Sequence, residues 1–144
     1  MKKRASLAFG TILAVVLAAG GAWAATDVED GKDLVDTCTA LLAEGTSAGS
    51  EGERCKNFLV NMIMAQKDTL TIGQPFRAER LGPDEKEQAC FQLPDSLPFA
   101  EFARQVTSYS ERNPGMVRRP AYELAARALE QAYPCSEDEM RGRP

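Results

Sequence analysis

The sequence predicts an all-α fold, a small disulfide-stapled bundle of about four helices. Three observations predict it. Apolar residues recur at helical spacing in four separate stretches, and no run alternates convincingly between apolar and polar residues as a half-buried strand does. The chain also has four cysteines in 144 residues, an even number that is typical of a small domain stapled by disulfides. A chain of this length is expected to form one domain.

The N-terminal segment, residues 1–24, has the pattern of a Sec-type signal peptide. The basic segment Lys2–Arg4 precedes the apolar run Ala5–Ala24, which ends in the small-x-small motif Ala22-Trp23-Ala24. An uncleaved membrane anchor is the alternative, but the run is rich in alanine and glycine and ends in a cleavage motif. We therefore expect cleavage after Ala24, export to the periplasm and a folded domain at residues 25–135.

Charge and composition exclude several classes of function. The net charge of −4 becomes −7 once the three basic residues of the signal peptide are removed, so no nucleic-acid partner is expected. The absence of histidine excludes His-based nucleophile pairs, His zinc sites and His haem ligation. We therefore expect no cofactor, no metal and no catalytic residue. No second apolar stretch is long enough to span a bilayer, so no membrane contact is expected after cleavage.

The first two helices are expected at Asp30–Glu44 and Gly52–Asp68. Asp30 is a candidate N-cap for the first of them. In the second, the main apolar stripe is accompanied by a smaller stripe, Val60 and Met64, on the far side of the helix. The smaller stripe indicates either a helix that is buried on most sides or a face that binds a second copy or another partner.

The second half of the domain begins with a segment that lacks sustained periodicity, residues 69–95. It is expected to be a long loop, with a short helical turn at Pro83–Ala89. A third helix is expected at Ser96–Arg112, with its first residue as the N-cap, and a fourth at Pro120–Tyr133. Residues 136–144 are expected to be a flexible polar tail.

Hairpin geometry favours one pairing of the four cysteines. Cys38 and Cys55 face each other across the first helical hairpin, whereas Cys90 precedes the third helix and Cys135 follows the fourth. We therefore expect the disulfides Cys38–Cys55 and Cys90–Cys135. A free reactive thiol or a Cys-only metal site is the alternative. It is disfavoured because no pair has metal-ligand spacing and no base is present to activate a thiolate.

Short motifs accompany three of the cysteines. They are "CKNFL" from Cys55, "CFQLP" from Cys90 and "ALEQAYPC", which ends at Cys135. Together, over nearly the whole chain after the signal peptide, they resemble the Rap/Tai-type immunity proteins of type VI secretion systems. Asn57 and Asn61 stand where that family commonly has glycine, so the second helix is expected to pack differently.

The resemblance implies a function. Such a protein would be a periplasmic helical bundle that binds its cognate effector, a peptidoglycan-cleaving amidase, and occludes the cleft of the enzyme without catalysis. Members of the family tend to be dimers, so Val60 and Met64 are the candidate face of a homodimer. The alternative is a structural or chaperone-like stress protein of the envelope without a dedicated effector. An enzyme is the least favoured interpretation.

The effector is expected to bind exposed loops. Seven residues are the candidate contacts, in the long loop and at the tip of the second helical hairpin. They are Arg77, Glu79, Arg80, Arg112, Met116, Arg118 and Arg119. For each of them the alternative is an ordinary solvated surface residue.

Overall fold

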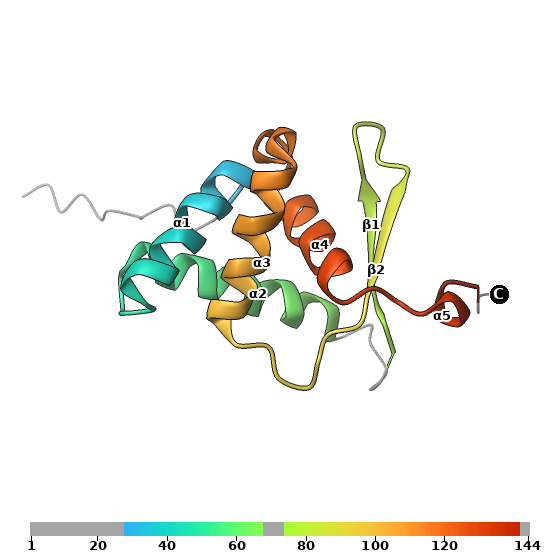
Figure 1. The fold of residues 1–144 in the computed structure, drawn as a ribbon, viewed down its shortest axis with the longest axis horizontal. Helices are drawn as coiled ribbons and strands as arrows, with labels where there is room; N and C mark the ends of the chain where they lie inside the picture. The colour runs from blue at the N-terminus through green and yellow to red at the C-terminus, as the bar shows by residue number, and fades with distance from the viewer. Residues whose placement is uncertain (1–27, 68–73, 142–144) are drawn as a thin grey trace, which may run out of the picture.

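A computed structural model of the chain describes residues 28–67 and 74–141. Within these residues the protein has five α-helices, one 3-10 helix and a two-stranded sheet (Figure 1). The bounds are α1 Gly31–Glu44, α2 Glu51–Lys67, β1 Phe76–Leu81, β2 Glu87–Phe91, α3 Phe99–Arg112, η1 Pro114–Arg118, α4 Ala121–Ala132 and α5 Glu137–Arg141. The expected signal peptide, residues 1–24, lies outside the described residues.

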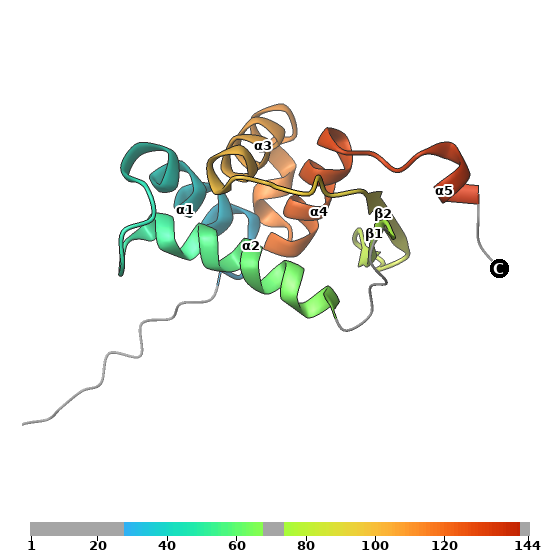
Figure 2. The same ribbon diagram turned by 90° about the horizontal axis from the view of Figure 1, so that it is seen from below.

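Helices α1 to α4 form the larger part of the fold. Figure 2 shows α2 along one side of the molecule, with α1, α3 and α4 on the other. Large side chains from all four helices are fully buried between them, namely Leu34, Leu59, Phe102, Leu124 and Leu129. Each such side chain contributes about 1.5–3 kcal/mol by leaving water. All four expected helices are present, with bounds that differ from the expected ones by no more than three residues.

Local chemistry explains where the helices begin. The Asp30 carboxylate accepts a hydrogen bond from the Asp33 N–H at 2.8 Å, so Asp30 caps α1 as expected. Ser96, in contrast, does not cap α3, which begins at Phe99 with Pro98 at the N-cap position. The reason is that Pro98 disfavours helical backbone in the residue before it, so the helix starts only after the proline.

The protein is mostly helical but not all-α, so that prediction is wrong. The segment expected to be a loop contains an antiparallel hairpin in which Phe76 pairs with Phe91 and Ala78 with Ala89. These four side chains are buried, and the two phenylalanine rings stack with their centroids 4.4 Å apart. Residues 83–89, expected to be a helical turn, instead form the hairpin turn and the start of β2.

The hairpin has a bulge, and the bulge explains why its sequence pattern is weak. The register shifts between Ala78 and Leu81, so β1 has one residue more than β2 over this stretch. Arg80, within the bulge, has the left-handed φ of 59°, which costs a non-glycine residue energy. Because the extra residue breaks the alternation between Ala78 and Leu81, β1 shows only a short run of period two.

Two disulfides are present, Cys38–Cys55 and Cys90–Cys135, the same pairs that the hairpin argument favours. Their Cα atoms are 5.0 and 5.5 Å apart, respectively. The first bond joins α1 to α2 in the core. The second joins β2 to the segment after α4, where the Gln92 N–H also donates to the Tyr133 carbonyl at 2.9 Å.

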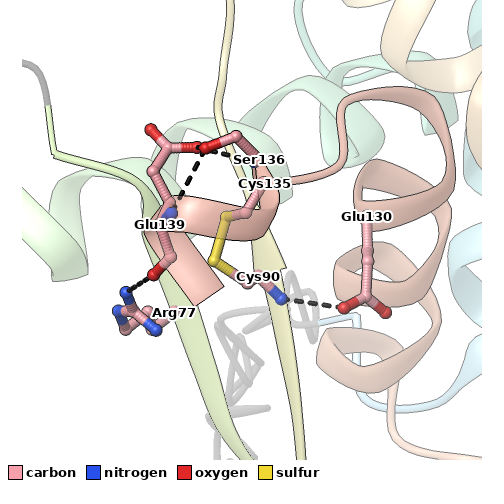
Figure 3. The surroundings of a disulfide bond; sticks show 6 residues. All are labelled: Arg77, Cys90, Glu130, Cys135, Ser136 and Glu139. Atoms are coloured by element: carbon pink, nitrogen blue, oxygen red, sulfur yellow. Dashed lines mark hydrogen bonds between the residues drawn. A yellow bond between two sulfur atoms is a disulfide. The ribbon is translucent and has the colours of Figure 1, made fainter. Parts of the chain in front are cut away.

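The expected flexible tail, residues 136–144, contains the short helix α5. A capping box at Ser136 starts it: the Glu139 N–H donates to the Ser136 hydroxyl at 3.2 Å, and the Ser136 N–H donates to the Glu139 carboxylate at 2.7 Å. Arg77 of β1 donates to the Glu139 carbonyl at 2.7 Å, so this helix is also tied to the hairpin (Figure 3).

Candidate partner-binding surface

The hairpin turn and the connection between α3 and α4 lie at the same end of the molecule, the upper end of Figure 1. One hollow lies between them, with Arg80 on one side and Arg119 on the other. A second hollow beside it is lined by Arg112, Met116 and again Arg119. Because Arg119 lines both hollows, they form one continuous surface. With Arg118 of η1, these residues make up what we call the tip surface.

A buried carboxylate links the two halves of the tip surface. Glu123, in the first turn of α4, is only 6% exposed. Its Oε1 accepts a hydrogen bond from the Gly82 N–H of the hairpin turn at 3.0 Å. Its Oε2 accepts from Nε and Nη2 of Arg119 at 3.0 and 2.8 Å. The charge of the buried Glu123 is therefore paired, and both of its oxygens are satisfied by different loops.

Two further side chains of α4 hold the rest of the hairpin. Arg127 donates to the Gln88 carbonyl at 3.2 Å and forms an ion pair with Glu87. Glu130 accepts from the Cys90 N–H at 2.9 Å, beside the disulfide (Figure 3). These residues and Glu123 lie at i, i+4 and i+7, so they share one helix face, and that face meets the hairpin.

The start of α1 fixes the other half of the tip surface. The Gly31 N–H donates to the Arg119 carbonyl at 2.7 Å, and the Ala121 N–H donates to the Glu29 carbonyl at 2.9 Å. A side chain at Gly31 would place its Cβ only 2.3 Å from the Met116 carbonyl oxygen. Position 31 therefore needs glycine because η1 crosses directly over it.

The charges on the tip surface are mostly basic. Arg80 and Arg118 are exposed, and within residues 28–67 and 74–141 neither guanidinium has a hydrogen-bond or ion-pair partner. Tyr122 lines the first hollow, and burial raises the pKa of its phenol above the ordinary value. The phenol therefore stays protonated at neutral pH and can donate a hydrogen bond.

Residues 30–135 match the family of Rap1a immunity proteins, and this stretch is well over half of the chain. The chain belongs to the Rap1a immunity protein family. The resemblance seen in the cysteine motifs is thereby confirmed. Membership implies that the protein binds a cognate effector protein as an inhibitor. No curated protein and no solved structure matches the chain significantly.

Metal-ligand clusters and membrane-spanning helices are both absent from the described residues of this Rap1a family member. Among those residues, no group of three or more His, Cys, Asp or Glu is placed to hold a metal ion. The helices within the same residues are too short or too polar to cross a membrane. The two disulfides are consistent with an exported protein.

The structure brings five of the seven candidate contacts of the Rap1a family member together and leaves Arg77 and Glu79 apart from them. Five of them make up the tip surface. Arg77 lies at the other end of β1, opposite Cys90, where its bond to α5 occupies it. Glu79 is exposed on β1, and its charge contributes to the raised pKa of Tyr122, which lines the first hollow.

The candidate dimer face lies elsewhere, on α2. Val60 and Met64 are 39% and 54% exposed, one turn apart. Nearby on the same helix, the Lys56 ammonium lies 5.9 Å from the centroid of the Phe99 ring. No described residue covers Val60 or Met64 enough to bury it.

Sequence reasoning missed Glu123, Arg127 and Glu130. The buried alanines and leucines of α4 form its core face, and beside them runs a polar stripe made of these three residues. The three residues are spaced four and three positions apart, so they lie on one face of the helix. This spacing indicates that the face packs against one neighbouring element. The neighbouring element is the hairpin, which could not be recognised because the sequence predicts a loop at those residues.

Proposed function

We propose that this protein is a periplasmic immunity protein that binds and occludes a peptidoglycan-cleaving amidase effector of a type VI secretion system. Inhibition is steric: the protein fills the approach to the enzyme's cleft and keeps the peptidoglycan strand out. It needs no catalytic group of its own.

The tip surface is the observation that carries this proposal. Arg80 and Arg118 are exposed without partners among the described residues. They can therefore pair with carboxylates of the effector without first breaking an internal ion pair. The half-buried Met116 adds an apolar contact at the centre, where binding energy is usually concentrated.

The support beneath the tip surface favours tight binding. Hydrogen bonds that the Glu123 carboxylate accepts hold the hairpin turn and Arg119, and the start of α1 holds η1 from the other side. A surface that is ordered before binding loses less conformational entropy when the partner arrives. The same surface is thus suited to entering a cleft that is itself rigid.

The location in the periplasm is supported by the cysteines. All four are in disulfides, which persist in oxidising compartments and are rare in a reducing cytosol. A peptidoglycan amidase acts in the same compartment, so inhibitor and target would meet there.

A homodimer through α2 is part of the proposal. Val60 and Met64 are exposed apolar side chains on one face of that helix, and a second copy would cover them. The test is the molar mass in solution: replacing both residues by glutamate is expected to give a monomer. The same molar mass for parent and variant would exclude this face.

Co-expression in the periplasm tests the function. A candidate amidase exported to the periplasm is expected to lyse its host, and co-export of this protein is expected to prevent lysis. The control is an amidase without its catalytic nucleophile, which should bind the protein but never lyse the host. If no encoded amidase is neutralised and many envelope proteins are captured weakly instead, the result supports a structural or stress role.

A further inference from the structure

We infer that Glu123 is a positioning residue that fixes the hairpin turn and η1 relative to each other, so that they meet the effector as one surface. The inference rests on the proposed function for its effect on binding. Its structural part concerns this chain alone and can be tested without a partner.

The geometry assigns a separate task to each carboxylate oxygen. Oε1 receives the Gly82 N–H at 3.0 Å, and Oε2 receives Nε and Nη2 of Arg119 at 3.0 and 2.8 Å. Gly82 begins the hairpin turn, and Arg119 directly follows η1. Within the described part of the chain, no other side chain bonds to both of these elements.

A charged group is needed for this task. The Gly82 amide is buried and would be left without a partner if Glu123 were shortened. The guanidinium of Arg119 would also lose its ion pair, in a site where only 31% of its side chain is exposed. A neutral amide of the same size can accept from Gly82, but it cannot balance the charge of Arg119.

The same helix provides a matched control. Glu130 lies two turns further along α4 and also accepts a backbone N–H of the hairpin, that of Cys90, at 2.9 Å. It also pairs with an arginine, because Nη1 of Arg127 is 3.1 Å from its Oε2. Glu130 therefore repeats the chemistry of Glu123 at the disulfide end, away from η1.

The experiment compares amide exchange in the disulfide-bonded protein for Glu123→Ala, Glu123→Gln and Glu130→Ala. We expect Glu123→Ala to accelerate exchange about tenfold or more at Gly82 and at the Arg119 amide, and to leave Cys90 unchanged. Glu130→Ala should accelerate exchange at the Cys90 amide and leave the Gly82 and Arg119 amides unchanged. Glu123→Gln should leave amide exchange at Gly82 slow and accelerate exchange only at the Arg119 amide.

Two outcomes would overturn the inference. One is an even rise in exchange across the whole chain, which would mean that Glu123 only stabilises the fold. The other is a change at Gly82 without any change at Arg119, which would mean that the two elements are not coupled. The Gln variant keeps the inference testable even if the Ala variant does not fold.

The binding part uses the same variants and the purified amidase that the parent protein neutralises. Affinity is expected to fall about tenfold or more for Glu123→Ala and to change little for Glu130→Ala. Equal affinities for the two would overturn the role of Glu123 in binding. If the parent binds no amidase, the proposed function fails, and the exchange pattern alone decides whether Glu123 couples the two elements.

Discussion

The hairpin is attached to α4 at both of its ends, but by different chemistry. At the base, the disulfide Cys90–Cys135 joins β2 to the chain after α4 covalently. At the tip, the turn is attached through the carboxylate of Glu123, and the same carboxylate also holds Arg119. The base is thus held to α4 by a covalent bond that salt and pH do not weaken. The tip is held to α4 only by hydrogen bonds and an ion pair.

If the tip surface binds the effector as proposed, this difference separates the residues that hold the fold from those that bind the partner. Because the covalent bond and the buried aromatic pair hold the base, residues at the tip can change without undoing the hairpin. The tip residues, in turn, can carry unpaired charge for a partner. Variants at the base, at the tip and in the tail can therefore test whether these regions are independent.

The largest effect is expected at the base. Replacing Cys90 and Cys135 together by serine removes a link between residues 45 apart, which should lower the free energy of unfolding by about 4 kcal/mol. Denaturant unfolding under oxidising conditions measures this. Removing Cys38 and Cys55, which are 17 apart, should cost about 3 kcal/mol by the same argument. A base variant that kept the parent melting temperature would show that the staple does not stabilise the fold.

The next effect concerns the support of η1. Gly31→Ala puts a methyl group 2.3 Å from the Met116 carbonyl oxygen, so η1 must shift, and we expect a loss of about 1–3 kcal/mol. Gly115→Ala, within η1 itself, is the matched control, because nothing lies within 4 Å of its Cβ. Thermal unfolding of the two variants should differ clearly. Equal melting temperatures would mean that α1 does not hold η1 in place.

A smaller effect, of opposite sign, is expected at the bulge. Arg80 has φ of 59°, which glycine adopts without strain, so Arg80→Gly should stabilise the protein by about 1 kcal/mol. Arg80→Ala keeps the Cβ and should give no such gain. Both variants lose the guanidinium, so both should bind the effector more weakly. A glycine variant less stable than the alanine variant would contradict the assignment of strain.

The smallest effect is expected in the tail and depends on pH. Hydrogen bonds from the Ser136 N–H and hydroxyl lower the pKa of the Glu139 carboxyl below its ordinary value. A lowered pKa in the folded state means that the contribution of Glu139 is present above the unfolded pKa and is lost as pH falls through the folded one. In acid, α5 should therefore fray first, seen as faster exchange at the Met140 amide. Glu139→Gln, which removes the titrating carboxyl, should abolish this pH dependence, whereas Ser136→Ala removes only the hydroxyl bond and should keep part of it.

Local signals in the sequence account for the helices and the disulfides. Asp30 marks the start of α1, and the spacing of the cysteines around two helical hairpins leads to the pairs that the structure contains. The helices depend on residues that are close in sequence. The disulfides involve only four cysteines, so few pairings are possible. The Rap1a family membership rests on motifs around the same cysteines.

The hairpin and its attachment could not be predicted in the same way. Each strand has only a short apolar alternation, Phe76 and Ala78 in one and Ala89 and Phe91 in the other, and the bulge at Arg80 interrupts the first. Gly82 and Pro83 indicate a turn between the strands, but a turn at these residues is equally compatible with a long loop. Hydrogen bonds between α4 and residues some 40 positions earlier leave no local pattern.

The dissociation constant of the complex with the cognate effector tests the role of the tip surface most directly. It should be measured for the parent, for Arg80→Ala with Arg118→Ala, and for Arg104→Ala with Arg141→Ala as a control of equal charge. Arg104 and Arg141 are exposed and lie outside the tip surface. We expect a loss of affinity of about a hundredfold for the tip pair and almost none for the control pair. Equal losses for both pairs, or none for either, would contradict this role of the tip surface.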